Sequence, residues 1–349
     1  MRLNLLRFNI TILIAVLFLA SCKNKVDIDE VPRYYVLNGE TMGTYYRIVV
    51  ATTDTMGIKA SIDDLLIKIN AEVSTYEGDS YITEINKSPK GAVFSNLPRH
   101  FKYNLEKAYW WYDHSDGYMD VSIGPLVNYW GFGTRKKSID LVDSVHVEQL
   151  KLLVGLEKWS FNIGDGILTK NRDEQYLDFS ALAKGYAVDE IGDLLRGKGI
   201  QDFLIDIGGE GRANGTNPKE KDWVIGISVP RSDAEMSEYQ LLVQLKNKAL
   251  ATSGNYRNYY EVKGGKYGHT IDPKSGYPFQ DELLSTTIIC DNAIDADAIA
   301  TSCMAMGYAK ATTFINSLPN VSACFLVGSE DGSIKTKFEN GFVQYIVRE

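Results

Sequence analysis

The sequence lacks the motifs that mark several common classes of enzyme. Its 349 residues include four histidines and four cysteines, and no C-x-x-C pair occurs. Without such a pair, neither a zinc site nor a disulfide framework is indicated. A P-loop, an H-E-x-x-H helix and a G-x-S-x-G turn are also missing. Their absence removes the signatures of P-loop nucleotide-binding proteins, zinc metalloproteases and α/β-hydrolases.

An excess of basic residues is absent as well. Lys and Arg number 37 against 45 Asp and Glu, which gives a formal net charge of -8. This balance argues against a nucleic-acid-binding protein. Any anionic ligand must then be held by local donors or by a metal ion, not by the overall field. The hydrophobic fraction of 44% and the charged fraction of 23% are those of an ordinary globular protein.

A glycine-rich run does not match the dinucleotide-binding fingerprint. Residues 209–215 are GEGRANG, so the third glycine comes one position too late for G-x-G-x-x-G. No helical pattern follows the run, although the fingerprint has to open a helix in order to hold a pyrophosphate. We therefore reject a dinucleotide-binding fold for this segment.

The first residues have the pattern of a secretion signal. Arg2 and Arg7 precede an apolar run at residues 10–20, and Leu-Ala-Ser leads directly into Cys22. The apolar run is too short to span a bilayer comfortably. A basic head, an apolar middle and small residues are typical of a secretory signal. The cysteine in this position resembles a bacterial lipoprotein lipobox.

Three segments are therefore expected along the chain. Residues 1–21 are predicted to be a lipoprotein signal peptide, residues 22–33 a lipidated Cys22 with a polar tether, and residues 34–349 one catalytic domain. Multiple acyl chains, palmitate among them, would anchor the protein to a membrane. The expected location is the bacterial cell envelope, facing the periplasm or the cell exterior. The alternative is an uncleaved N-terminal anchor helix.

Strands and helices are mixed irregularly in the predicted domain. Strands are expected at residues 44–50, 176–179, 203–207, 223–229, 239–245 and 284–290. Helices are expected at residues 62–73, 181–196 and 294–318, the first with a capping-box-like start at Ser61 and Asp64. Because regular β-α-β alternation is missing, we predict an α+β fold with mixed, mostly antiparallel strands and packed helices in a single compact unit.

One acidic segment could hold a metal ion. Residues 291–301 are DNAIDADAIAT, and Asp297 and Thr301 are four apart on a predicted helix, so their oxygens share one face. A carboxylate and a hydroxyl suit a hard cation such as Mg²⁺. The alternatives are a carboxylate that only complements the helix dipole and a threonine that bonds back to its own helix.

A second segment could receive a phosphate. Residues 176–189 are YLDFSALAKGYAVD, with Lys184 beside Gly185 near the start of a predicted helix. Free N–H groups, the positive end of the dipole and an ammonium group would converge there. The alternative is a solvated surface lysine. Asp178, in an apolar stretch, requires a partner if it is buried.

Two further segments carry candidate ligand contacts. His269, in residues 266–278 (KYGHTIDPKSGYP), is either an acid–base group or a structural residue before a turn. Residues 117–133 (GYMDVSIGPLVNYWGFG) supply aromatic rings and glycines for either a packed corner or a platform under a planar ring. Tyr76 is a further stacking candidate.

Together these segments form an ordered series. The series consists of TMGT at 41–44, STY at 74–76, the stretch 120–133, the stretch 177–189, GG at 208–209, TSGNY at 252–256, the stretch 269–278 and the stretch 296–301. It resembles the ApbE family of FAD:protein FMN transferases from about residue 36 to 345. Two departures are FSAL at 179–182, where a glycine-rich stretch is usual, and Asn255 in place of an aspartate. Because the asparagine removes a carboxylate, position 255 is not assigned a base role.

The resemblance implies a set of site residues. Metal ligands would be the side chains of Asp297 and Thr301 and the carbonyl of Ala181, holding Mg²⁺. His269 would lie beside the phosphates and, with Asp297 and Lys184, make up the catalytic set. The residues expected to line the FAD site are Met42, Tyr76, Tyr118, Met119, Asp120, Asp178, Lys184 and Ile271.

The resemblance also implies a reaction. FMN would move from FAD to a Ser or Thr hydroxyl of an acceptor flavoprotein subunit, and AMP would be released. Mg²⁺ and Lys184 would neutralise the pyrophosphate, and either a carboxylate near the metal or His269 would take the proton of the hydroxyl. Two rivals share the same site: a Mg²⁺-dependent FAD pyrophosphatase that yields FMN and AMP, and a non-catalytic flavin-binding lipoprotein.

Overall fold

The computed structural model describes residues 33–133, 142–230, 238–255, 259–262, 265–279, 282–329 and 331–348. The chain divides into the units Met1–Arg33 and Tyr34–Glu349, and the following description concerns the second. The predicted signal peptide, Cys22 and nearly all of the tether lie outside the described residues. Within the described ranges, no helix combines the length and the apolar character needed to cross a bilayer.

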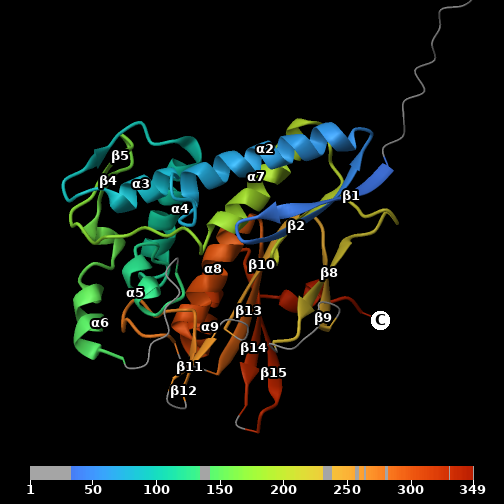
Figure 1. Ribbon diagram of the computed structural model, residues 1–349. Helices are drawn as coiled ribbons and strands as arrows, with labels where there is room; N and C mark the ends of the chain where they lie inside the picture. The colour runs from blue at the N-terminus through green and yellow to red at the C-terminus, as the bar shows by residue number, and fades with distance from the viewer. Residues whose placement is uncertain are drawn as a thin grey trace, which may run out of the picture. The chain divides into compact units, whose positions relative to one another are not determined.

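One large sheet organises the second unit (Figure 1). Its strand order is β1-β2-β6-β7-β10-β13-β14-β15, and neighbouring strands from β2 onward are antiparallel. The strands are β1 (Arg33–Thr41), β2 (Thr44–Thr52), β6 (Phe203–Ile207), β7 (Glu210–Asn214), β10 (Lys248–Gly254), β13 (Leu283–Cys290), β14 (Ser322–Gly328) and β15 (Ile334–Glu339). The predicted α+β class with mostly antiparallel strands is confirmed.

Apolar side chains cover both faces of this sheet. Along β10, Ala249 and Ala251 belong to a core shared with the helices, whereas Leu250 belongs to a second core on the opposite face. Side chains alternate between faces along a strand, so a strand buried on both sides has an almost continuous apolar sequence. The helices α7 (Ala183–Gly197) and α8 (Ala293–Met306) contact the first face, and the hairpin of β8 (Trp223–Ser228) and β9 (Tyr239–Leu245) packs against the second.

The predicted long helix at residues 294–318 is two helices. α8 ends at Gly307, whose φ of 74° is incompatible with a continuing right-handed helix, and α9 (Tyr308–Ser317) starts after it. Almost every side chain of α8 is buried, as expected for a helix that is apolar all round. The cysteines Cys290, Cys303 and Cys324 are free and buried, as the apolar sequence around each predicts.

The predicted capping box at Ser61 is also wrong. The helix α2 (Thr55–Val73) begins about two turns earlier, because Asp54 is its N-cap and accepts a hydrogen bond from the N–H of Gly57. Ser61 lies inside the helix, and its hydroxyl donates to the carbonyl of Gly57. An acceptor side chain at the true N-cap was therefore the stronger start signal.

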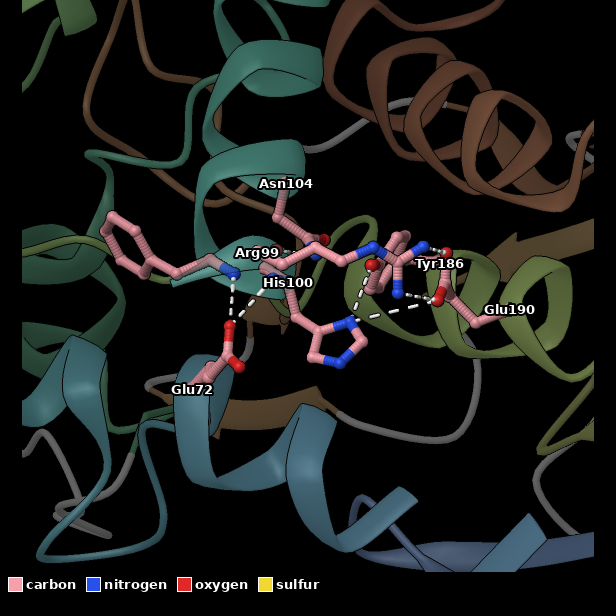
Figure 2. A network of polar contacts seen from close by, with 7 residues as sticks. Glu72, Arg99, His100, Asn104, Tyr186 and Glu190 are labelled. Carbon is pink, nitrogen blue, oxygen red and sulfur yellow. Dashed lines mark hydrogen bonds and ion pairs between the residues drawn. The ribbon is translucent and has the colours of Figure 1, made fainter. Parts of the chain in front are cut away.

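A polar network joins α2, α4 (Arg99–His114) and α7 (Figure 2). α4 has no side-chain cap of its own. Glu72 of α2 accepts hydrogen bonds from the N–H groups of His100 and Phe101, at 2.7 and 2.9 Å. His100 Nδ1 lies 2.7 Å from the hydroxyl of Tyr186, and Arg99 forms a bidentate pair with Glu190 of α7. The contacts of Arg99 and His100 thus link α4 to α7, whereas Glu72 bonds to the start of α4.

Smaller elements complete the unit. They are α3 (Tyr81–Lys87), β3 (Val93–Phe94), α5 (Gly124–Tyr129), α6 (Ser144–Lys151), the 3-10 turn η1 (Leu156–Lys158), β4 (Ser160–Asn162), β5 (Ile167–Thr169), β11 (Tyr259–Val262), β12 (Gly265–Gly268) and the 3-10 turn η2 (Phe342–Tyr345). The segment at residues 176–179 forms no strand. Its backbone bonds to a loop instead, as the contacts of Asp178 show below.

Candidate active site

Asp297 lies where α7 and α8 meet. Its side chain is buried, and its Oδ2 accepts a hydrogen bond from the backbone N–H of Gly185 at 3.1 Å. A Cβ at position 185 would lie 2.3 Å from the carbonyl oxygen of Ala293, so only glycine allows the two helices this approach. Burial raises the pKa of Asp297, while Lys184 and the Gly185 N–H act in the opposite direction.

Asp189 of α7 caps the N-terminus of α8. Its two carboxylate oxygens accept hydrogen bonds from the N–H groups of Ala293 and Ile294, at 3.0 and 2.9 Å. Arg212 of β7 pairs with the same carboxylate at 2.5 Å. A carboxylate at a helix N-terminus satisfies free N–H groups and complements the dipole. Asp189 thus fixes the N-terminus of α8 against α7, and this contact positions Asp297 one turn further along α8.

Lys184 pairs with a residue that the sequence patterns did not single out. Its Nζ lies 3.3 Å from Oε1 of Glu210, the first residue of β7, whose side chain is only 4% exposed. Burial opposes the charge of Lys184, but the carboxylates of Glu210 and Asp297 outweigh it and raise the lysine pKa. The expected cationic side chain at the start of α7 is therefore present, paired with Glu210 and within electrostatic range of Asp297.

Glu210 could have been found from its setting in the sequence. It follows the Gly208-Gly209 turn and opens the short segment EGRAN at residues 210–214. A carboxylate that enters a sheet interior requires a cationic partner. The glycines of this run carry no dinucleotide fingerprint, and the signal in it is the charge of the glutamate.

Thr301 lies one helical turn beyond Asp297 and meets β10. Its hydroxyl is 3.5 Å from the hydroxyl of Ser253, in the predicted TSGNY segment. The hydroxyl of Thr252, the preceding residue, bonds across to Thr287 of β13 at 2.9 Å. The strand pair therefore presents Ser253 toward α8.

The segment before α7 forms a turn instead of the predicted strand. The Asp178 N–H donates to the carbonyl of Val121 at 2.7 Å, and Asp178 Oδ1 accepts from the N–H and the hydroxyl of Ser180. This geometry is an Asx turn. The partner that Asp178 was expected to need is thus its near neighbour Ser180.

The carbonyl of Ala181 stays outside the hydrogen-bond ladder of α7. In a regular helix the N–H of Gly185 would bond to the carbonyl four residues earlier, which is that of Ala181. It donates to Asp297 instead, and the helix starts at Ala183 with Leu182 as N-cap. Among the described residues, no N–H of α7 therefore bonds to the Ala181 oxygen.

These donors fit a hard divalent cation. They comprise one carboxylate, one hydroxyl and one backbone carbonyl, all oxygen ligands of the kind that Mg²⁺ takes. In the described ranges, this site included, no group of three or more His, Cys, Asp or Glu side chains is placed to hold a metal. Mg²⁺ usually keeps several water or phosphate oxygens, so a protein set this sparse suits a metal shared with a phosphate ligand.

A second group of contacts gathers around Tyr118. Its hydroxyl accepts a hydrogen bond from Lys310 of α9 at 2.5 Å, and the Nζ atoms of Lys310 and Lys274 lie 5.1 and 5.2 Å from its ring centre. Met119 is buried beside it. Asp120 is also buried, and its Oδ1 accepts from the N–H and hydroxyl of Ser122. Burial raises the pKa of Asp120 to about 6, although Ser122 opposes the shift.

The glycine-rich aromatic segment and the turn at residues 271–278 pack together. Trp130 Nε1 donates to the carbonyl of Gly276 at 2.9 Å. Ile271 is buried in the same small core, and the ring of His269 lies 6.3 Å from that of Phe132 in an edge-on arrangement. These two segments therefore form a packed corner, which is one of the two readings that their sequence allows.

The remaining predicted ligand contacts occupy loops. Met42 is in the turn between β1 and β2 with a φ of 50°. Tyr76 follows α2 and is 70% exposed. Partial desolvation and the charge of Asp178 raise its pKa, and Lys184 opposes them. Tyr76 is thus within electrostatic range of Lys184, whereas Tyr118 contacts Lys310 and Ile271 packs in the small core around Trp130.

Fold and contacts together define the class of the protein. It is a mostly antiparallel α+β protein in which two buried carboxylates and a partly exposed lysine gather where two helices and a strand meet. The chain belongs to the ApbE family, whose sequence model matches residues 42–325.

Individual relatives match over nearly the whole chain. An FAD:protein FMN transferase of Haemophilus influenzae is 31% identical over 93% of this chain and 94% of its own length, and one of Vibrio cholerae is 32% identical over 92% and 93%. Among solved structures, a flavin transferase ApbE from Vibrio cholerae has a TM-score of 0.81 at 29% identity, covering 90% of this chain and 99% of that one. A Pseudomonas stutzeri flavinyl transferase ApbE in its apo form has a TM-score of 0.81 at 28% identity, with 90% and 97% covered.

Proposed function

We propose that this protein is an FAD:protein FMN transferase. It moves FMN from FAD to a Ser or Thr hydroxyl of an acceptor protein and releases AMP. The names of its relatives support this activity. The observation that carries it in this chain is the convergence of Lys184, Asp297 and the Ala181 carbonyl at the start of α7, which suits a dianionic pyrophosphate with a divalent cation.

The proposed metal ligands are Asp297, Thr301 and the Ala181 carbonyl. Mg²⁺ bound there would supply positive charge to the pyrophosphate. The chain itself contributes the Lys184 ammonium, held in the N-terminal turn of α7, where the positive end of the helix dipole favours an anion. Met42, Tyr76, Asp178, Ile271 and the Tyr118 loop are proposed to line the remainder of the FAD site.

The reaction is a displacement at phosphorus. The acceptor oxygen forms a bond to the FMN phosphorus, the bond from that phosphorus to the bridging oxygen breaks, and AMP leaves with the electron pair. The hydroxyl loses its proton. The candidate acceptors of this proton are a carboxylate near the proposed metal and the imidazole of His269. No covalent enzyme intermediate is needed. The rate enhancement comes from positioning the reacting groups and from electrostatic stabilisation of the transition state.

The activity test uses the mature chain, FAD, MgCl₂ and an acceptor flavoprotein subunit. Transfer predicts an added riboflavin-phosphate mass on the acceptor and one AMP per modified hydroxyl. AMP together with free FMN and an unmodified acceptor would instead establish the pyrophosphatase. Bound FAD with no AMP over hours would establish the flavin-binding lipoprotein.

We also propose that Cys22 is lipidated and that the enzyme is held at the cell-envelope membrane, facing the periplasm or the cell exterior. The pattern of residues 10–22 supports this placement. Labelled palmitate should enter the wild-type protein and not a Cys22→Ser variant expressed in bacteria. Equal labelling of both proteins would refute the assignment.

A further inference from the structure

Glu210 presents a buried carboxylate that the fold itself does not require. Oε1 meets Lys184 Nζ at 3.3 Å, and in the described part of the chain Oε2 is buried with no hydrogen-bond partner. A buried oxygen without a donor is destabilising. A buried ion pair is seldom more stable than an apolar pair of the same size. The side chain therefore costs stability where it lies.

Two carboxylates, those of Glu210 and Asp297, could form the ion pair with Lys184. Glu210 and Asp297 both act on its charge, yet its ion pair is with Glu210. Asp297 receives the neutral N–H of Gly185 on its Oδ2. The carboxylate of Asp297 is thereby kept out of a lysine salt bridge.

This pairing matters for a cation. A lysine bonded to Asp297 would place a positive charge on the one carboxylate of the proposed metal site and would compete with the metal. Without Glu210, Asp297 is the carboxylate with the strongest remaining attraction for Lys184, ahead of Asp178. Groups that orient a metal ligand typically change metal affinity by about 10- to 100-fold when removed.

We propose that Glu210 is a positioning residue: it pairs with the Lys184 ammonium, and so keeps Asp297 open to the divalent cation and the lysine directed to the phosphates. This inference rests on the metal site of the proposed function. It predicts that the effect of removing Glu210 passes through Lys184, which a purely structural role or direct metal ligation would not do.

The test is a double-mutant cycle on Mn²⁺ binding to the full mature chain. Electron paramagnetic resonance measures the binding, with Mn²⁺ as the sole added ligand. Glu210→Gln should weaken Mn²⁺ binding on the order of tenfold. Lys184→Met should bind Mn²⁺ at least as tightly as the wild type. The double variant Glu210→Gln/Lys184→Met should return to the affinity of Lys184→Met, because the competing cation is gone.

A matched control separates this effect from loss of stability. Glu72→Gln removes a carboxylate of the α2–α4–α7 network and should leave Mn²⁺ affinity unchanged. If the double variant stays as weak as Glu210→Gln, Glu210 does not act through the lysine and the inference is overturned. Equal weakening in Glu72→Gln, or unchanged affinity in Glu210→Gln, overturns it too.

The cycle is independent of the transfer assay. A wild-type protein that transfers flavin but shows no rescue in the double variant would sink the inference and leave the proposed function intact. A rescued cycle in a protein that modifies no acceptor would sink the proposed function instead. A wild-type protein that binds no Mn²⁺ overturns the metal site and the inference together.

Discussion

Gly185 donates its backbone N–H to the carboxylate of Asp297 over 3.1 Å, from a position where a Cβ would lie 2.3 Å from the carbonyl oxygen of Ala293. The close packing of α7 on α8 and the placement of a proposed metal ligand thus depend on the same missing side chain.

Gly185→Ala should therefore damage stability and the site together. The added methyl group meets backbone atoms, which do not rotate away, and we expect a loss of about 2 kcal/mol in the free energy of unfolding. Gly197→Ala is the matched control, because nothing lies within 4 Å of a Cβ at the end of the same helix. That variant should be unchanged or slightly more stable. Urea unfolding measures both, and equal stabilities would contradict the clash.

Asp189→Asn should loosen the start of α8. The amide removes the charge that pairs with Arg212, and one of its two ends no longer accepts an N–H of the helix. Breaking a buried pair on one side costs about 3 kcal/mol. Asp193→Asn, which breaks an exposed pair with Arg196 on the same helix, should cost less than about 0.5 kcal/mol. Similar melting temperatures for the two variants would rule out the capping role.

Asp120→Asn should stabilise the protein above neutral pH. The folded pKa of Asp120 is raised to about 6 from 3.8, so the folded state binds the proton more tightly than the unfolded state. Stability from this group is complete below about pH 4 and is lost as the pH rises through 6, which amounts to about 3 kcal/mol. The asparagine oxygen can still accept both bonds from Ser122.

The measurement is the free energy of unfolding from pH 4 to 8. The difference between Asp120→Asn and the wild type should grow with pH and level off above pH 7. A constant difference over that range would show that Asp120 is not a strained carboxylate. Because Asp120 is also a proposed FAD contact, the more stable variant is expected to bind FAD less well.

Asp297→Asn should lower the rate of Mg²⁺-dependent AMP release from FAD by roughly 100-fold or more. The amide oxygen can keep the bond from Gly185, so the variant should fold. Asp291→Asn, an exposed position at the start of the same segment, should retain full activity. A circular dichroism melt confirms folding, and an active Asp297→Asn enzyme would remove this residue from the metal site.

Much of the fold follows from local patterns in the sequence. The strand at residues 203–207 was predicted at its exact bounds, because alternating apolar residues end in a Gly-Gly turn. The break at Gly307 was missed, since apolar periodicity continues on both sides of it and only a positive φ separates the two helices. The segment around Asp178 has a strand-like composition, but its backbone pairs with Val121 through a contact that no local pattern encodes.

The sequence predicts the individual residues of the proposed site, but it does not predict the ion pair between Lys184 and Glu210. The spacing of Asp297 and Thr301 indicates a shared helix face, and the resemblance to the family assigned both to a metal. The ion pair of Lys184 with Glu210 joins a helix to the far side of a Gly-Gly turn. Such long-range pairs depend on how α7 lies over β7, and composition gives no measure of that.

The bond between Gly185 and Asp297 spans 112 positions of the chain. During translation, α7 and six of the eight strands of the main sheet leave the ribosome before α8 does. A nascent chain that stalls before residue 297 therefore contains Lys184 and most of the scaffold but lacks Asp297, so the proposed cation pocket is complete only after α8 has been synthesised.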